Sequence, residues 1–296
     1  MGLMDIAFPN LGIYLKDVPK TISVFGFQIA FYGMIIAVGV LLGFTMASKE
    51  GDRLGHPKDF WWDFSIPAIV FSVIGARIYY VAFSWDMYKG NLKEIFNIRH
   101  GGLAIYGAVI AGFLTSYIFC KIKKVSYLSA VDAAVFGLLV GQIIGRWGNF
   151  MNREAFGGYT NGLFAMRLPI EAVRQSDISA DIAAHIVEGT NYIQVHPTFL
   201  YESFLNLCLF IIMLLYRKHK RFDGEMALFY LGGYGIIRFF VEGLRTDQLQ
   251  IGTTGIAVSQ MLGLGLFAVS VIVAVIMHIR ISKKQKLPKR QDEKIK

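Results

Sequence analysis

Seven runs of mostly apolar residues, separated by polar segments, constrain the fold of this chain more than any other feature. The runs cover roughly residues 28–48, 63–83, 103–120, 129–147, 199–216, 226–244 and 256–279. Each comes close to the ~20 apolar residues that a helix needs to cross a bilayer. Hydrophobic residues make up 54% of the chain and charged residues 17%, as in polytopic membrane proteins. The pattern therefore predicts an all-α polytopic membrane protein with seven transmembrane helices.

Lys and Arg are unevenly distributed among the connecting segments. They are frequent after the first, third and fifth runs and in the C-terminal tail, and sparser in the other connections. Because short cytoplasmic loops carry an excess of positive charge, we expect the N-terminus outside and the C-terminus in the cytoplasm. Residues 1–10 contain no Lys or Arg, so they lack the cationic start of a cleavable signal peptide.

The connection between the fourth and fifth runs is the longest, and by this topology it lies outside. A loop of this length without structure of its own is uncommon, so we expect a small folded head there. The predicted order is an outer N-terminal segment, four transmembrane helices, the extracytoplasmic head, three more helices and a basic cytoplasmic tail. These parts cover residues 1–27, 28–147, 148–198, 199–279 and 280–296.

A polar stretch at residues 145–158 follows directly on the fourth apolar run. It places Arg146 near the end of a membrane helix, and Asn149, Asn152 and Glu154 follow within about two turns. An ionisable residue in such a position indicates a functional site. The alternative is an interfacial arginine whose charged group simply extends to the lipid headgroups.

Polar side chains of the other runs fall at the same depth, close to the outer surface, when the predicted topology is applied. The set comprises Tyr32, Arg77, Tyr106, His196, Tyr201, Glu202, Arg238 and Glu242. Independent interfacial residues would be divided between the two surfaces of the membrane. Their convergence at one level therefore indicates a single site.

The sixth run carries four polar residues on one helical face. Tyr234, Arg238, Glu242 and Arg245 are spaced by four, four and three residues, so they lie above one another on a helix. Glu242 can pair with either arginine, which lowers the cost of charge at that depth. A structural ladder of salt bridges between helices is the alternative interpretation.

The arginines indicate the chemical class of the ligand. A planar guanidinium offers a fork of donors suited to phosphate, so Arg77, Arg146 and Arg238 are predicted to cradle a phospholipid headgroup. Asn149 and Asn152 are placed to donate to glycerol hydroxyls. The basic residues do not gather on one face, so we expect no nucleic acid partner. The sequence shows no Gly-x-Ser-x-Gly element, so we expect no serine nucleophile. It shows no acidic cluster with metal-ligand spacing, so we expect no metal, and we expect no cofactor.

Four sequence blocks occur in the order found in phosphatidylglycerol–prolipoprotein diacylglyceryl transferases, and the chain resembles that family over about residues 25–280. The block at residues 145–157 is the most specific of the four. The blocks are Phe31-Tyr32-Gly33; Gly145-Arg146-Trp147-Gly148-Asn149-Phe150-Met151-Asn152 with Glu154 and Gly157; His196-Pro197-Thr198-Phe199-Leu200-Tyr201-Glu202; and Tyr234-Gly235-Ile236-Ile237-Arg238 with Glu242 and Arg245.

The resemblance implies an enzyme of the bacterial cytoplasmic (inner) membrane whose active site faces the outer side. Such an enzyme transfers the diacylglyceryl group of phosphatidylglycerol to the lipobox cysteine of a prolipoprotein signal peptide, forms a thioether and releases glycerol phosphate. By family position, Arg146 and Arg238 hold the phosphate, and Glu154 belongs to the headgroup pocket. The further substrate-binding residues are then Tyr32, Arg77, Asn149, Asn152, Gly157, Glu202, Tyr234, Glu242 and Arg245.

One position departs from the family's commonest pattern. Members often carry His-Gly-Gly at the start of the third helix, with that His proposed as the base. Here the aligned residues are Tyr106-Gly107-Ala108, and His100-Gly101-Gly102 lies six residues earlier. A tyrosine with an unperturbed pKa near ~10 is a poor base at neutral pH. Tyr106 can therefore hydrogen-bond the substrate while the arginines lower the thiol pKa, or His196 or Glu154 takes the proton.

Two other functions remain open at this stage. A transporter or channel for an anionic solute would use the same arginines as a selectivity site, although the inner halves of the second, fourth and sixth runs are nearly apolar. A lipid-binding protein without chemistry is the other possibility.

Overall fold

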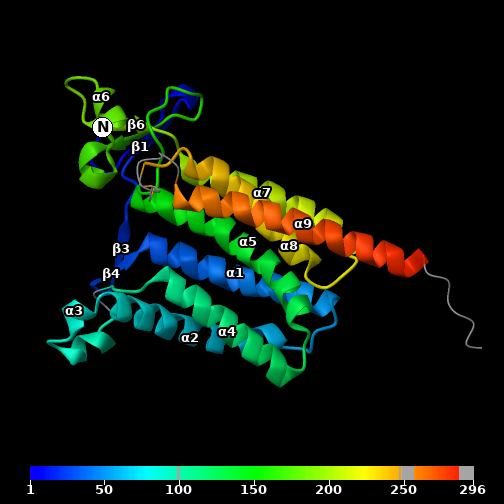
Figure 1. Cartoon of the computed structure of the whole chain (residues 1–296). Helices are drawn as coiled ribbons and strands as arrows, with labels where there is room; N and C mark the ends of the chain where they lie inside the picture. Colours follow the sequence, from blue (N-terminus) through cyan, green and yellow to red (C-terminus); the bar gives the residue numbers. More distant parts are fainter. Residues whose placement is uncertain (99–100, 247, 249–256, 287–296) are drawn as a thin grey trace, which may run out of the picture. The chain divides into compact units, whose positions relative to one another are not determined.

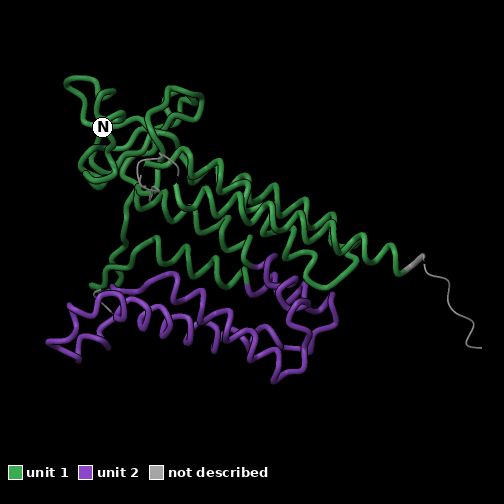
Figure 2. Tube along the Cα trace, viewed as in Figure 1, with its two compact units in different colours: residues 1–43, 138–296 green, residues 44–137 purple. Residues whose placement is uncertain are grey.

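The computed structural model describes residues 1–98, 101–246, 248 and 257–286 (Figure 1). The chain divides into two compact units (Figure 2). Unit 1 comprises Met1–Gly43 and Leu138–Lys296, and unit 2 comprises Phe44–Gly137. Each unit is described by itself below.

Seven long helices correspond to the seven predicted apolar runs. They are α1 (Phe31–Arg53), α2 (Phe60–Phe83), α4 (Ile105–Lys123), α5 (Tyr127–Asn152), α7 (Thr198–Tyr216), α8 (Glu225–Glu242) and α9 (Val258–Lys286). Within the described residues, all of these except α8 are long and apolar enough to cross a membrane, which makes six candidate spans. Helix α8 carries Glu225, Arg238 and Glu242. The chain is therefore a multi-pass membrane protein.

Unit 1 contains a small antiparallel sheet that joins the N-terminus to the predicted head. Its strands lie in the order β2-β1-β5-β6. Strand β1 pairs with β5 through Ala7 and Arg167. The strands are β1 (Ile6–Phe8), β2 (Ile13–Leu15), β5 (Met166–Pro169) and β6 (Tyr192–Val195). The N-terminal segment therefore shares a sheet with the head, and the fold is mostly helical rather than all-α.

Short elements complete the description. Strands β3 (Thr21–Val24) and β4 (Phe27–Ala30) form a hairpin directly before α1, where the sequence predicted the start of the first helix. The short helices are α3 (Trp85–Tyr88), α6 (Ala180–Ala184), η1 (Pro9–Leu11), η2 (Leu92–Phe96), η3 (Ile170–Ala172), η4 (Gln175–Asp177) and η5 (Arg217–His219).

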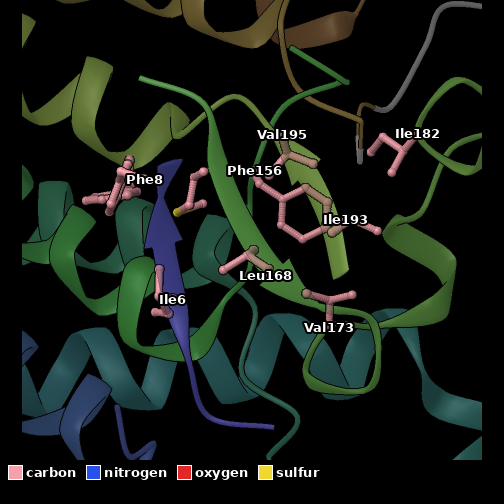
Figure 3. Packing of buried hydrophobic residues seen from close by; sticks show 10 residues of the cluster. Ile6, Phe8, Phe156, Leu168, Val173, Ile182, Ile193 and Val195 are labelled. Atoms are coloured by element: carbon pink, nitrogen blue, oxygen red, sulfur yellow. The ribbon is translucent and has the colours of Figure 1, made fainter. Parts of the chain in front are cut away.

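The head has its own hydrophobic core (Figure 3). Ile193 and Val195 alternate with more exposed neighbours along β6, the period of a strand with one buried face. They pack with Ile6 of β1, Leu168 of β5 and Phe156, which follows α5. The core combines residues of the N-terminal segment with residues that follow α5. The head is therefore a packed structure and not an unstructured loop.

Arg153 ties the N-terminal segment to the end of α5. The residue is only 2% exposed, and its φ of 56° turns the chain sharply after the helix. Its guanidinium donates hydrogen bonds to the carbonyl oxygens of Met4, Val18 and Met151. This buried cation therefore holds the strands of the head against the helix that carries the polar stretch.

Glycines allow the helices of unit 1 to approach closely. Helix α8 packs against both α7 and α9, and it crosses α9 at Gly235 and Gly263. A Cβ atom built on either glycine would lie 2.5 Å from the carbonyl oxygen of the other. Helices α1 and α5 approach at Gly39 and Gly141, where the corresponding distances are 3.5 and 3.8 Å. Small residues at such crossings are typical of membrane helices.

Candidate active site

A buried carboxylate joins the two arginines of the predicted site. Glu202, in the second turn of α7, is 1% exposed. Its Oε1 lies 2.9 Å from Nη2 of Arg146 on α5, and its Oε2 lies 3.1 Å from Nη1 of Arg238 on α8. The side chains of Arg146 and Arg238 are 20% and 18% exposed. One carboxylate therefore connects the head-side ends of three helices.

Two further side chains of α8 complete this arrangement. Glu242 forms an ion pair with Nη2 of Arg238, four residues earlier, and the Tyr234 hydroxyl donates to Oε1 of Glu202 over 3.2 Å. The single helical face that the spacing predicted is thus present, and its salt bridges are formed. We call Arg146, Glu202, Arg238 and Glu242 the charged cluster. Arg245 follows the helix and pairs with Gly157 in an isolated β-bridge.

The polar stretch extends the charged cluster toward the head. Arg146 Nη1 donates to Oδ1 of Asn149 (3.3 Å), and Nδ2 of Asn149 donates to Oε1 of Glu154 (3.0 Å). Asn152 donates to the same Glu154 oxygen at 3.4 Å. Helix α5 continues to Asn152, so Arg146, Asn149 and Asn152 lie on its last turns, and Glu154 lies two residues beyond its end. On its other side, Glu154 lies 3.5 Å from Nη2 of Arg174, a partner that sequence reasoning missed.

Gly157 has a packing reason to be glycine. A Cβ there would lie 2.7 Å from the Leu244 carbonyl oxygen and 2.8 Å from Cβ of His196. The Gly157 N–H donates to the His196 carbonyl (3.0 Å), and the Gly158 N–H donates to the Leu244 carbonyl (2.9 Å). The glycine therefore allows three separate chain segments to meet beside the site.

Tyr32 is the one predicted site residue from α1, and it packs against the polar stretch. A Cβ on Gly148 would lie 2.8 Å from Cδ2 of the Tyr32 ring. The absence of a side chain at Gly148 thus lets the aromatic ring rest on the backbone of α5, two residues after Arg146.

His196 lies just before α7, between the head and the helices. Its Nδ1 is 3.3 Å from the Tyr201 hydroxyl. Burial lowers the pKa of His196 below its usual value, because a charged imidazolium is poorly solvated there. The side chain is therefore neutral at neutral pH, which is the form of an imidazole that can accept a proton.

Arg77 belongs to unit 2, and its donors are occupied. The residue is 8% exposed, and its guanidinium lies 5.1 Å from the centre of the Tyr88 ring. All five of its N–H groups are directed at main-chain oxygens between α2 and α4. The acceptors are the carbonyls of Glu94, Ile95, Asn97, Gly101 and Gly102. Arg77 is thus a clamp for this connection, and its place in a phosphate cradle stays a prediction.

Tyr106 also belongs to unit 2. It lies in the first turn of α4, is 66% exposed and has its ring centre 6.2 Å from that of Tyr79. His100, from the Gly-Gly sequence that precedes it, lies outside the described residues.

Fold and site together define a multi-pass membrane protein in which two arginines at helix ends share one carboxylate beside a folded head. A family model described as prolipoprotein diacylglyceryl transferase matches residues 19–276. A phosphatidylglycerol–prolipoprotein diacylglyceryl transferase of Clostridioides difficile is 41% identical over 264 residues, which cover 89% of this chain and 95% of the relative. The chain belongs to the prolipoprotein diacylglyceryl transferase family.

Two further relatives with the same name agree. The protein of Bacillus cytotoxicus is 43% identical over 252 residues, covering 84% of this chain and 88% of the relative. That of Finegoldia magna is 39% identical over 262 residues, covering 88% and 94%. None of the three is a transporter, so the alternative of an anion transporter has no support.

Proposed function

We propose that this protein transfers the diacylglyceryl group of phosphatidylglycerol to the lipobox cysteine of a prolipoprotein signal peptide. The cysteine sulfur attacks the glycerol carbon that bears the phosphate, a C–S bond forms and the C–O bond to phosphate breaks. Its electron pair leaves with glycerol phosphate, and the thiol proton passes to a base. The observation that carries the proposal is the Arg146–Glu202–Arg238 bridge, in a chain of this family.

The charged cluster suits a leaving group that gains negative charge. Glu202 holds both guanidinium groups in fixed orientations, so little reorganisation is needed when phosphate binds. Each guanidinium has five N–H donors, and the hydrogen bonds within the described residues do not use all of them on Arg146 or Arg238. The remaining donors are available to phosphate oxygens, with which Glu202 then shares the positive charge.

The headgroup's glycerol is assigned to the polar end of α5. Asn149 and Asn152 carry amide groups that suit hydroxyls, and Glu154 already accepts hydrogen bonds from both amides. Tyr32 and Tyr234 adjoin this region through Gly148 and Glu202, respectively. Gly157, Glu242 and Arg245 support the site by shaping its backbone and by orienting Arg238.

We assign the thiol proton to His196. Its imidazole is kept neutral by burial, whereas the Glu154 carboxylate already accepts hydrogen bonds from two amides and lies 3.5 Å from Arg174. Tyr106→Phe tests the family-based alternative. Activity that persists after the loss of this hydroxyl would exclude Tyr106 as the base, and its abolition would overturn the assignment to His196.

We propose that all seven long helices cross the cytoplasmic membrane, with the N-terminus and the active site on the outer side. Helix α8 has three charged residues, but the pairing of Arg238 with Glu202 and Glu242 lowers the cost of burying them. The distribution of Lys and Arg supports this orientation.

The decisive test uses purified protein with phosphatidylglycerol and a lipobox peptide. Mass spectrometry should detect the diacylglyceryl thioether on the peptide cysteine and glycerol phosphate in solution. Arg238→Ala and Asn149→Ala should abolish turnover while the protein still inserts and folds. Near-normal rates in both variants would show that the charged cluster is structural, and a missing thioether with intact substrates would reject the function.

A further inference from the structure

A second layer of polar side chains lies one helical turn farther from the head than Arg146, Glu202 and Tyr234. It consists of Gln142 on α5, Asn206 on α7 and Tyr230 on α8. Each is four residues from a member of the site on the same helix, namely Arg146, Glu202 or Tyr234. Four residues correspond to about 6 Å along a helix axis. Three helices therefore carry a polar group at the same deeper level.

Hydrogen bonds and stacking connect this layer to the site. Gln142 Nε2 lies 2.8 Å from the Tyr230 hydroxyl. The Tyr230 ring stacks on the Tyr234 ring, with centres 5.6 Å apart and planes inclined by 4°. Tyr234 in turn donates to Glu202. Gln142 is thus connected, through Tyr230 and Tyr234, to the Glu202 carboxylate that pairs with both arginines.

Asn206 is the unexplained member of the layer. It is 0% exposed, and neither its Nδ2 nor its Oδ1 has a hydrogen-bond partner among the described residues. The same holds for Oε1 of Gln142. A buried amide with no partner destabilises a protein, so such groups are ordinarily satisfied by protein atoms or by ordered water.

The position of Asn206 on α7 shows where its side chain lies. Glu202, Asn206 and Leu209 follow one another on one face of the helix. Glu202 contacts Tyr234, and Leu209 is so close to Gly233 that a Cβ there would lie 2.5 Å from Cδ1 of Leu209. Asn206 lies between these two contacts, so it faces α8.

We propose that this layer is an internal hydration site, in which bound water links Asn206 to Gln142. A buried water makes about three hydrogen bonds, and the unsatisfied atoms supply one amide donor group and two acceptors. The water completes the hydrogen bonds of the layer and holds Tyr234 and Glu202 in place. Asn206 and Gln142 are thus positioning residues, and this second role rests on the proposed transferase activity.

The first experiment needs no activity. Radiolytic hydroxyl-radical labelling of the full-length protein in detergent modifies side chains next to bound water. Tyr230 should be labelled in the unchanged protein and at least about fivefold less in Asn206→Leu. Thermal unfolding supplies a second measurement. If the layer holds no water, Asn206→Leu removes an unsatisfied amide and should raise the unfolding midpoint. If water is bound, the same change removes a satisfied amide and should leave the unfolding midpoint unchanged or lower it.

The second experiment measures the positioning role. Asn206→Leu should lower kcat about tenfold and change the KM for phosphatidylglycerol by less than about twofold. Asn206→Ser, which keeps a polar group and leaves room for water, should restore most of the rate. Met213→Leu is the matched control, because Met213 is fully buried on the same helix.

Two results would overturn the proposal. One is Asn206→Leu with full kcat, a raised unfolding midpoint and unchanged labelling of Tyr230. The other is a rate loss in Asn206→Leu that disappears with a dialkyl ether lipid, because a lipid carbonyl would then be the partner of Asn206. If the unchanged protein forms no thioether, labelling and unfolding still decide whether the water is present.

Discussion

Arg77 and Arg238 are both largely buried arginines, but their partners differ in kind. Every N–H group of Arg77 meets a neutral main-chain carbonyl in unit 2. Arg238 in unit 1 meets two carboxylates and retains donors. The carbonyl partners of Arg77 occupy all of its N–H donors and hold the connection between α2 and α4 in place. The two carboxylate partners of Arg238 orient its guanidinium and leave donors for an incoming anion. We therefore expect the set of partners, more than the residue type, to distinguish a structural arginine from one that binds substrate.

The largest effect is expected from Arg238→Lys. Lysine keeps the charge but lacks the planar fork that contacts Glu202 and Glu242 together. We expect kcat to fall about 10²–10³-fold, the usual cost of losing a donor aimed at developing negative charge. Steady-state assay with phosphatidylglycerol and a lipobox peptide measures it. Arg167→Lys is the matched control on the head, where Arg167 contacts Gln194 and Tyr192. A loss below about threefold would place Arg238 with Arg77 as a structural residue.

Glu202→Gln should separate binding from catalysis. The change removes the negative charge shared by Arg146 and Arg238, so phosphate should bind more tightly and the KM should fall. The arginines lose their common anchor, so kcat should drop roughly 10–100-fold. Glu225→Gln is a control of similar burial, since Glu225 is 4% exposed and contacts Tyr216 and His278 instead. A raised KM with unchanged kcat would contradict the anchoring role.

Arg77→Met should act on stability and not on chemistry. It leaves five main-chain carbonyls without their donors, and we expect a loss of roughly 2–4 kcal/mol in the free energy of unfolding. The kcat of the folded fraction should remain within about twofold. Lys89→Met serves as the control, because Lys89 is exposed and its ion pair is with exposed Asp86. Denaturant titration measures the stability of both variants, and assays of the active fraction measure their kcat. A hundredfold fall in the kcat of Arg77→Met without destabilisation would indicate that Arg77 binds phosphate.

The smallest effect is a pH dependence assigned to His196. Burial lowers its pKa from 6.5, so the neutral base predominates above that pH and protonation sets in only below it. Plotted against pH, kcat/KM should be level above pH 6.5 and should fall at lower pH, approaching tenfold per unit once His196 is protonated. In His196→Gln this acidic limb should be absent. An identical limb in the variant would assign the proton to another group.

The sequence predicted the helical segments well because their cause is local. In lipid, the backbone hydrogen bonds of a helix are made within the segment itself, so an apolar run of sufficient length marks the helix. The structure shifts most boundaries by only a few residues, as for α5, which reaches Asn152. The sheet of the head was missed for the opposite reason. Ala7 pairs with Arg167, and strands of three or four residues carry no pattern that names so distant a partner.

The sequence predicted which residues belong to the candidate site better than it predicted their contacts with one another. Arg146, Arg238 and Glu202 were all selected from their depth and motif, but the sequence assigned Glu202 to the substrate. Its ion pairs with both arginines also had a general signal, since two arginines at membrane depth require counter-charges. Arg174 and Asn206 had no such signal. The first is one of several exposed cations, and the second becomes unusual only when its neighbours leave it unsatisfied.

By itself, the sequence determined the apolar helices, the polar residues at their ends and the family, because these depend on local composition and ordered motifs. Only the tertiary structure decided which arginine donors are occupied, that the N-terminal strands complete the head, and that Asn206 is buried without a partner. These outcomes depend on contacts between residues far apart in the chain. A buried polar group gains or loses free energy through such contacts, so its role follows from the partner it meets.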